Sequence, residues 1–504
     1  MAENNLDYLF HPRSIAVAGA AIGNKYLQGL LECNFQGKLY PINPAGGELF
    51  GLKVYKSIAE VPDSIDYVIL CVRAGFTPRF MTEAAAKGVK AIHFFSSGFG
   101  EVEDARGKEL ENEILALARS LGIRILGPNC MGIYCPQSGL SFSLSLPDQD
   151  AFPRQSGPLA FISQSGGNSI FFVNDAVTRG IHFSKVVSFG NGVDIAESEL
   201  LEYLASDPET EIITAYLEGV RDGGRFARTL KKVAEVKPVI VCKVGQTESG
   251  MRAAASHTGS LAGSQQIWEG VLKQANAVKV DSIEELTDAA MLFLRCPVPA
   301  GNRVAVVGSG GGASVQAADD FANAGQTLPP LTAEAKRRLR ETFGSETGCS
   351  FRNPVDIMRM DPEIIKALHD SPGVDTLVLH IVIDLWSMID KQSVATAAVE
   401  SFIKVKPELT KPAVVVIHCQ STGRARWLAD QAQKKLVEAG FPVYPTMKRA
   451  ALALQRYRQW GQAAKNLLLQ QPRQLQRSPH DESCRLQTGF VSFDAESNTR
   501  IKVA

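Results

Sequence analysis

The segment Arg303-Val-Ala-Val-Val-Gly308-Ser309-Gly310-Gly311-Gly312-Ala313-Ser314 indicates the fold class of this chain most clearly. Its apolar run predicts a buried strand, and the four glycines lead into a helix-like stretch. A strand, a glycine turn and a helix in that order form the repeating unit of α/β folds with parallel sheets. Glycines at a helix start also let several backbone N–H groups approach an anion. No lysine follows in the Walker A position, so the segment is not a P-loop NTPase motif.

The same alternation extends over most of the chain. Apolar runs that predict strands lie at Ser14–Ala18, Tyr67–Val72, Ala91–Phe95, Leu159–Ile162, Lys185–Ser188, Ile212–Leu217, Val239–Val244, Arg303–Val307, Thr376–Ile383 and Ala413–His418. Longer helix-like segments separate them, and the runs are too many for one sheet of ordinary size. Proline-containing stretches at 145–156 and 296–302 offer boundaries. We therefore expect domains at 1–145, 146–298 and 299–462, followed by a polar tail at 463–504.

The composition restricts the classes of partner and compartment. The 504 residues contain 53 Lys and Arg and 53 Asp and Glu, so bulk charge gives no reason to expect nucleic acid or an acidic membrane surface. The nine cysteines are scattered without a C-x-x-C pair, which favours a reducing compartment. No segment approaches the roughly 18 apolar residues of a membrane span, and the first residues lack the pattern of a signal peptide. We expect a soluble, cytoplasmic protein.

Glycine-rich and amide-bearing turns follow successive strands of the first expected domain. The turn Gly19-Ala20-Ala-Ile-Gly23-Asn-Lys25 is by itself a weak sign of phosphate binding, because one glycine after a strand is more often a tight turn. Further turns are Tyr40-Pro-Ile-Asn43-Pro44, Cys71-Val72-Arg73, Ser96-Ser97-Gly98-Phe99-Gly100 and Gly127-Pro-Asn129-Cys130-Met-Gly132. In a doubly wound sheet all of these turns face one crevice. They suit a long, polar, phosphate-bearing ligand better than a packed core.

Three pieces of the second expected domain carry reactive or anion-binding groups. The turn Ser163-Gln164-Ser165-Gly166 could offer phosphate a positive helix end, or could be only a serine N-cap. Glu218 ends a buried strand, where it either faces solvent or orients an imidazole. His257 is expected in a loop between a strand ending near Val244 and a helix beginning near Ser264. A histidine alone in a loop is usually an ordinary surface residue.

Taken together, these motifs resemble the nucleoside-diphosphate-forming acyl-CoA synthetases of the succinyl-CoA synthetase superfamily. The Y-P-I-N-P, S-S-G-F and G-P-N-C-M-G turns are similar to those of the family's CoA-binding domain. The family's phosphohistidine domain is similar to this chain in three pieces, S-Q-S-G-G, Y-L-E-G and S-H-T-G-S-L-A-G. A further flavodoxin-like domain of the family resembles the segment that begins at Arg303, together with Asn353-Pro-Val-Asp356. The resemblance spans roughly residues 8–460. One departure is a shortened G-A-A-I-G-N-K-Y loop, where the family carries G-A-S…G-K-V-G.

The resemblance implies a fold and a set of site residues. The fold is a Rossmann-like CoA-binding domain followed by two flavodoxin-like, succinyl-CoA synthetase-like domains with parallel sheets. His257 would be phosphorylated, Glu218 would orient it, and two opposed helix starts would hold the phosphate. The implied phosphate-binding residues are Ser163, Gln164, Ser165, Gly166, Gly310, Gly311 and Gly312. The implied CoA contacts are Gly19, Ala20, Lys25, Asn43, Pro44, Val72, Arg73, Ser96, Ser97, Gly98, Asn129 and Cys130.

The resemblance also implies an activity, that of the alpha subunit of an ADP-forming acyl-CoA synthetase, an acid–thiol ligase. Phosphate and acyl-CoA would give acyl phosphate and CoA, and the phosphoryl group would pass to His257 and then to ADP. No ATP-grasp domain is recognisable, so we expect the nucleotide and Mg²⁺ on a separate beta subunit in an α2β2 assembly, and no metal ligand in this chain. The substrate would be a small carboxylic acid or its acyl-CoA. The alternative is a non-catalytic regulatory protein that binds CoA or acyl-CoA, which the altered Gly19 loop favours and the retained His257 and Glu218 oppose.

Overall fold

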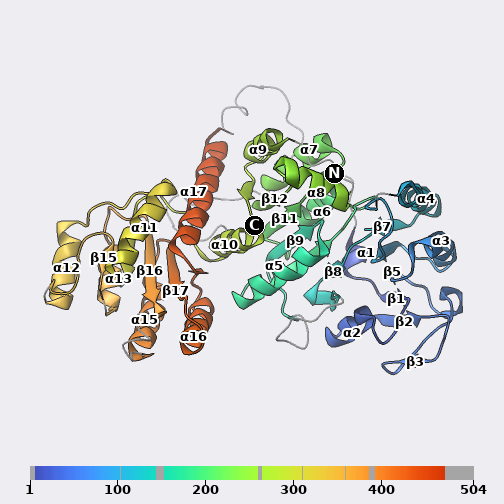
Figure 1. Ribbon diagram of the computed structural model, residues 1–504, viewed down its shortest axis with the longest axis horizontal. Helices are drawn as coiled ribbons and strands as arrows, with labels where there is room; N and C mark the ends of the chain where they lie inside the picture. The colour runs from blue at the N-terminus through green and yellow to red at the C-terminus, as the bar shows by residue number, and fades with distance from the viewer. Residues whose placement is uncertain are drawn as a thin grey trace, which may run out of the picture. The chain divides into compact units, whose positions relative to one another are not determined.

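The computed structural model describes residues 6–102, 104–142, 153–258, 264–308, 310–344, 346–357, 359–384 and 392–470 (Figure 1). The chain divides into two compact units, of which the first holds Met1–Val177 and Ile181–Leu286 and the second holds Thr178–Gly180 and Thr287–Ala504. Within the described residues, the first unit contains two large sheets and the second unit contains one. The expected α/β class with parallel sheets is therefore confirmed.

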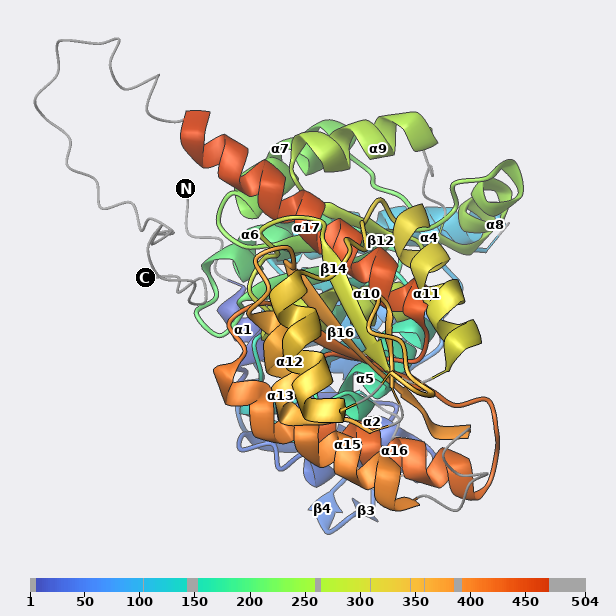
Figure 2. The same cartoon turned by 90° about the vertical axis from the view of Figure 1, so that its left-hand side faces the viewer.

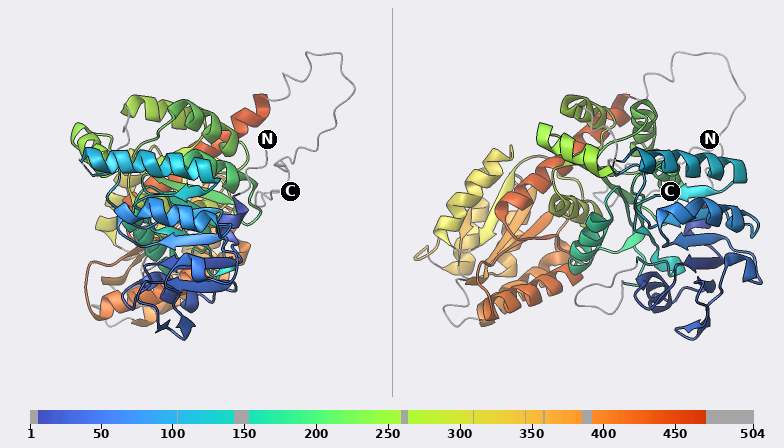
Figure 3. Two further views of the ribbon diagram at one scale, coloured as in Figure 1. Left: turned by 90° about the vertical axis from the view of Figure 1, so that its right-hand side faces the viewer. Right: turned by 45° about the vertical axis from the view of Figure 1, so that its right-hand side comes forward.

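The first sheet consists of parallel strands in the order β2-β1-β5-β6-β7. The elements are α1 (Asp7–Phe10), β1 (Ser14–Ala18), α2 (Lys25–Glu32), β2 (Lys38–Ile42), β3 (Glu48–Leu49), β4 (Leu52–Lys53), β5 (Tyr67–Leu70), α3 (Thr77–Ala85), β6 (Ala91–Phe94), α4 (Ala105–Leu121) and β7 (Arg124–Leu126). Helices α3 and α4 pack side by side (Figure 3). Because the strand order reverses between β1 and β5, the carboxyl ends of these two strands form a switch point, where doubly wound sheets bind ligands.

An ion pair supports the amino end of this sheet. The Arg13 guanidinium donates two hydrogen bonds to Asp66, with Nε 2.9 Å from Oδ2 and Nη2 3.1 Å from Oδ1. The Arg13 backbone N–H donates to the same carboxylate at 3.0 Å. The Arg13 side-chain hydrogen bond holds the pKa of the Asp66 carboxyl at about 2, below its ordinary value of 3.8.

The second sheet has the order β13-β12-β11-β9-β10-β8, with β8 antiparallel at one edge. Its elements are β8 (Gly132–Tyr134), β9 (Leu159–Ser163), α5 (Gly166–Thr178), β10 (Phe183–Ser188), α6 (Glu197–Ser206), β11 (Ile212–Leu217), α7 (Gly223–Ala234), β12 (Val239–Lys243), α8 (Glu248–Thr258), α9 (Gln265–Gln274) and β13 (Val278–Val280). Its switch point lies between β9 and β11. Although β8 precedes the expected domain boundary at residue 145, it pairs with β10, so the chain enters the second sheet earlier than that boundary.

The third sheet repeats the same parallel order as β15-β14-β16-β17-β18. Its elements are β14 (Val304–Gly308), α11 (Gly311–Asn323), α12 (Ala333–Phe343), β15 (Val355–Asp356), α13 (Pro362–His369), β16 (Thr376–Val382), α15 (Gln392–Val405), β17 (Ala413–His418), α16 (Arg424–Glu438), β18 (Val443–Tyr444) and α17 (Met447–Gln470), and α10 (Ile283–Arg295) precedes them. Helices α12, α13, α15 and α16 pack in succession, and α17 packs on α11 (Figure 2). The glycine-rich segment at 303–314 thus leads from β14, which lies between β15 and β16, into α11.

All ten predicted strands are present, and the strands that were not predicted are short or contain proline. β3, β4, β7, β8, β13, β15 and β18 have two or three residues each, which is too few for a periodic signal. The remaining one, β2, includes Pro41 and lies at the edge of its sheet, where proline is tolerated because no ladder hydrogen bond is lost.

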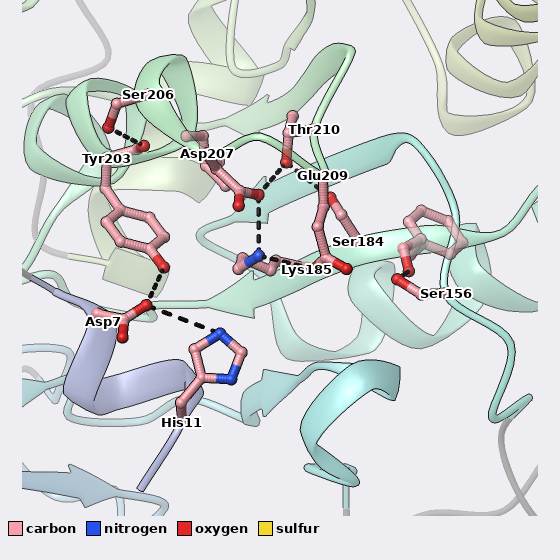
Figure 4. A network of polar contacts seen from close by, with 12 residues as sticks. Asp7, His11, Ser156, Ser184, Lys185, Tyr203, Ser206, Asp207, Glu209 and Thr210 are labelled. Atoms are coloured by element: carbon pink, nitrogen blue, oxygen red, sulfur yellow. Dashed lines mark hydrogen bonds and ion pairs between the residues drawn. The ribbon is translucent and has the colours of Figure 1, made fainter.

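Apolar and polar contacts join the first two sheets into one unit. A single cluster of buried side chains includes residues of both sheets, such as Val17 of β1 and Ile162 of β9. The Phe10 ring stacks on Tyr203 with 4.8 Å between centroids, and the Tyr203 hydroxyl donates to Asp7 at 3.2 Å (Figure 4). Lys185 is 1% exposed and donates to Asp207 at 2.9 Å in the same network. This shared core explains why the first two sheets are not separate compact units.

Candidate functional site

The turns after β1 and β2 are held together at the carboxyl edge of the first sheet. Gly19 has a φ of +83°, and a Cβ atom there would lie less than 3.0 Å from the Cys71 carbonyl oxygen after β5, so only glycine fits. The Gly19 N–H donates to the Ile42 carbonyl at 2.9 Å. The Asn43 side-chain amide donates to the Ala20 carbonyl, also at 2.9 Å. The two turns thus form one continuous rim.

The turns after β5, β6 and β7 extend the same rim. The Ser96 hydroxyl donates to the Val72 carbonyl, and the Asn129 N–H donates to the Ser96 carbonyl at 3.0 Å. The structure therefore brings all five predicted turns to one edge of the sheet. The other expected contact residues in these turns are Pro44, Ser97 and Gly98.

Side chains along this rim differ in what they can offer a ligand. Lys25 and Arg73 are exposed, as are the apolar Ile22 (81%) and Phe76 (62%), a mixture that suits a ligand with both charged and apolar parts. In contrast, two of the expected contact residues, Ala20 and Cys130, are each only 3% exposed, so they can reach a ligand only through main-chain atoms.

The thiols at this edge are poor nucleophiles. Burial raises the pKa of the Cys71 thiol to about 12. Burial also raises the pKa of Cys130, whose sulfur lies 3.8 Å from the Phe94 carbonyl oxygen. Burial therefore favours the protonated form of both thiols near neutral pH, which lowers their nucleophilicity.

At the switch point of the second sheet, Ser163 and Ser165 organise the start of α5. The Ser165 N–H donates to the Ser163 hydroxyl oxygen at 3.1 Å, and that hydroxyl donates to the Ser165 carbonyl at 2.8 Å. The Ser165 hydroxyl oxygen accepts the N–H of Asn168 at 3.3 Å. The first N–H groups of a helix have no acceptor inside the helix, so those of Gly166 and Gly167 are candidates for binding an anion. The two serines cap this helix start.

Glu218 lies directly across the switch point from this helix start. It follows β11, next to β9, and is 5% exposed. Gln164 accepts the backbone N–H of Glu218 at 2.5 Å and that of Gly219 at 3.0 Å through its side-chain oxygen. This oxygen is therefore bound to the Glu218 turn, whereas we expected Gln164 to bind phosphate.

The expectation that His257 lies in a loop is wrong for the backbone. Helix α8 runs from Glu248 to Thr258 and includes both Gly250 and His257. The Thr247 hydroxyl oxygen accepts the Gly250 N–H at 3.1 Å and so starts the helix. The run M-R-A-A-A-S after Gly250 has high helix propensity, which outweighs the glycines that suggested a loop. The imidazole of His257 and residues 259–263 lie outside the described part of the structure.

A carboxylate lies at the start of α11, where we expected Gly310, Gly311 and Gly312 to bind phosphate. The Gly310 N–H donates to Asp356 Oδ1 at 2.8 Å, and Asp356 Oδ2 lies 3.5 Å from where a Cβ atom of Gly311 would be. Gly312 has open space around it, and Ser309 lies outside the described residues. Because α11 belongs to the second unit and α5 to the first, the opposed arrangement of the two helix starts stays a prediction.

Comparison with known proteins identifies this arrangement. The family model for a succinyl-CoA ligase like flavodoxin domain matches residues 156–293, and that for a CoA binding domain matches residues 13–136. The alpha subunit of acetate–CoA ligase (ADP-forming) I from Pyrococcus furiosus is 36% identical over 473 residues, which cover 91% of this chain and 98% of that protein. The chain belongs to the family of ADP-forming acetate–CoA ligase alpha subunits.

Some ADP-forming ligases to which the chain is similar are longer. Acetate–CoA ligase (ADP-forming) I from Archaeoglobus fulgidus is 38% identical over 358 residues, which cover 70% of this chain but 50% of that protein. The chain thus spans about half the length of this relative. Among solved structures, acetyl-coenzyme A synthetase 1 of Ca. Korarchaeum cryptofilum, in complex with phosphate and ADP, matches with a TM-score of 0.78 and 32% identity and covers 92% of this chain and 99% of that one.

Sequence reasoning missed the polar residues that link the CoA-binding domain of this ligase chain to the second sheet. The Asn191 side-chain amide donates to Glu101 Oε2 at 2.6 Å, and Glu101 Oε1 accepts the Gly98 N–H at 2.5 Å. The Met131 N–H donates to the Ser188 hydroxyl oxygen at 3.1 Å. Ser188 and Asn191 lie in the segment S-F-G-N-G at 188–192, and no local pattern in it shows that it contacts the turns of the first sheet.

Proposed function

We propose that this ligase alpha chain interconverts acyl-CoA, phosphate and ADP with a carboxylic acid, CoA and ATP, through an acyl phosphate and a phosphohistidine at His257. The observation that carries the proposal is the switch point of the second sheet, where the start of α5 and the buried Glu218 follow the adjacent strands β9 and β11. A helix start that accepts an anion, next to a carboxylate that can orient an imidazole, suits phosphoryl transfer to histidine.

CoA is the substrate of the first domain, and we propose that it binds along the rim of turns after β1, β2, β5, β6 and β7. Exposed Lys25 and Arg73 would pair with its phosphates, while Gly19, Asn43 and Ser96 hold the rim in shape. The main-chain turn at Asn129 lies where this rim meets the second sheet. The thioester end of CoA would therefore reach the switch point of the second sheet.

We propose the following chemical steps. A phosphate oxygen, held by the N–H groups of Gly166 and Gly167, attacks the thioester carbonyl, the C–S bond breaks, and the CoA thiolate takes up a proton. An imidazole nitrogen of His257 then attacks phosphorus, and the P–O bond to the carboxylate breaks. Glu218 accepts a hydrogen bond from the other imidazole nitrogen and stabilises the positive charge that develops on the ring.

Delivery of the phosphoryl group to ADP would take place on a partner. The chain covers nearly all of the Pyrococcus furiosus alpha subunit but half of the Archaeoglobus fulgidus ligase, so the other half would be a separate beta subunit. We propose an ATP-grasp fold and Mg²⁺ for that subunit, in an α2β2 assembly. Among the described residues of this chain, no group of three or more His, Cys, Asp or Glu side chains could hold a metal ion.

We also propose a cytoplasmic location. The eight cysteines within the described residues form no disulfide bond with one another, which fits a reducing compartment. None of the described helices has the length and hydropathy needed to cross a bilayer.

The test is to incubate the purified chain with labelled acetyl phosphate and to measure acid-labile label on the protein. We expect label on the wild-type chain and none on His257→Ala, with CoA binding by calorimetry unchanged in the variant. An unlabelled wild-type chain that still binds CoA would favour the non-catalytic regulatory protein. Undiminished label on His257→Ala would reject His257 as the carrier.

A further inference from the structure

We infer that Gln164 and Lys243 hold the main chain of Glu218 from opposite sides and are positioning residues for its carboxylate. The inference rests on the proposed function, because it assigns these two side chains a part in orienting His257. Both residues act through Glu218 and need not touch substrate.

The N–H side of the Glu218 peptide is held by Gln164. This side chain extends from the end of β9 and is 5% exposed. Its oxygen accepts two consecutive backbone N–H groups, those of Glu218 and Gly219, at 2.5 and 3.0 Å. Its own backbone N–H donates to the Tyr216 carbonyl at 3.2 Å, which fixes the side chain relative to β11.

The carbonyl side of the same peptide is held by Lys243. This residue ends β12, on the other side of β11 from β9, and is 1% exposed. Its ammonium donates to the Glu218 carbonyl at 2.9 Å and also to the Val244 carbonyl. The ammonium lies 4.9 Å from the centroid of the Trp268 ring on α9, which limits its movement.

These contacts replace the sheet ladder where it ends. Beyond Leu217, β11 pairs no further with β12, and buried backbone groups need hydrogen-bond partners. Side chains from both neighbouring strands supply them instead. A buried ammonium is costly, and burial lowers the pKa of Lys243 to about 8 although the nearby Glu218 charge opposes this change.

Lys237 is a matched control at the opposite end of the same strand. It precedes β12, is 6% exposed, and donates to two backbone carbonyls, those of Leu204 at 2.8 Å and Asp207 at 2.5 Å. Burial lowers its pKa to about 8 as well. Lys237 and Lys243 thus share burial, charge and kind of hydrogen bond, and they differ in whether the carbonyl belongs to Glu218.

The experiment measures single-turnover labelling of the full chain by acetyl phosphate, with the maximal rate and the half-saturating concentration determined separately. We expect Lys243→Met to lower the maximal rate about tenfold to a hundredfold, because small misplacements of a reacting group cost that much. The half-saturating concentration should change less than about twofold. Lys237→Met should keep the wild-type rate, although both variants lose stability.

Repeating the measurement in a chain that carries Glu218→Gln separates a positioning role of Lys243 from a general loss of structure. If Lys243 acts through Glu218, then Lys243→Met should lower the rate less than about twofold in a Glu218→Gln chain, because coupled residues are not additive. Gln164→Met should behave in the same way and serves as the second variant if Lys243→Met does not fold.

The outcomes distinguish this inference from the proposed function. Equal rates for Lys243→Met and Lys237→Met, or the same loss with and without the Glu218 carboxylate, would overturn the positioning role while labelling at His257 stands. A wild-type chain without label would overturn the proposed function, and the inference with it.

Discussion

Replacing Gly190 with alanine tests whether the turn after β10 sets the position of a CoA-binding turn. Gly190 has a φ of +53°, and a Cβ atom there would lie less than 3.0 Å from the carbonyl oxygens of Pro128 and Asn129. Both oxygens belong to the main chain of the G-P-N-C-M-G turn, so no side-chain rotation can relieve the clash. The turn itself would have to move.

The cost has two parts. Alanine in the left-handed region costs about 1–2 kcal/mol, and forcing atoms into a filled space costs about 1–3 kcal/mol more. Gly192 in the same turn is the control for the backbone cost, so the difference between the two alanine variants gives the cost of the steric clash. Its φ is +56°, but a Cβ atom would meet only side-chain atoms, at 3.1 Å from Phe189 and 3.3 Å from Ala196. Gly192→Ala should therefore cost only the backbone term, about 1–2 kcal/mol.

Urea unfolding and calorimetric titration with CoA measure the two consequences. We expect Gly190→Ala to be less stable than Gly192→Ala by about 1–3 kcal/mol. We also expect a higher Kd for CoA in Gly190→Ala, because the Asn129 turn is displaced, and a wild-type Kd in Gly192→Ala. Equal stability losses in the two variants, or a wild-type Kd in Gly190→Ala, would refute the close approach as the reason for glycine at this position.

Three further predictions use single sites. Because its ion pair lowers the pKa of Asp66 to about 2, that pair should stabilise the fold fully above pH 3.8 and lose its effect as the pH falls toward 2. In the wild-type chain the urea concentration at the unfolding midpoint should therefore fall between pH 3.8 and pH 2, and Asp66→Asn should remove this fall. The same fall in both chains would count against the ion pair as its cause. Asp356→Asn removes the negative charge that now competes with phosphate for the Gly310 N–H. The phosphate concentration that half-saturates labelling from acetyl-CoA should therefore fall about two- to fivefold. An unchanged concentration would exclude phosphate binding at this helix start. Phe172 is fully buried and Phe171 is 65% exposed, so alanine should cost about 3–5 kcal/mol of unfolding free energy at Phe172 and less than about 0.5 at Phe171; similar losses would contradict the packing of α5.

The predictable part of the site is the part encoded in short segments. The strand-turn-helix segments at 160–170 and 303–314 predicted β9 with α5 and β14 with α11, because an apolar run and a glycine turn are visible within a dozen residues. The prediction failed for His257, where helix propensity and flanking glycines pointed in opposite directions and the glycines were given too much weight. It also missed Asp356 as the acceptor at the start of α11, because the two lie 46 residues apart.

By itself, the sequence determined the α/β class, ten of the strands, the family and the turns that gather at the sheet edges. Only the tertiary structure decided that Gln164 binds the Glu218 turn, that Lys243 completes that contact, and that β8 joins the second sheet. The physical reason is that strand order is set by how whole sheets bury their faces. A hydrogen bond such as that between Gln164 and Glu218, 54 residues apart, exists only once β9 and β11 have become neighbours.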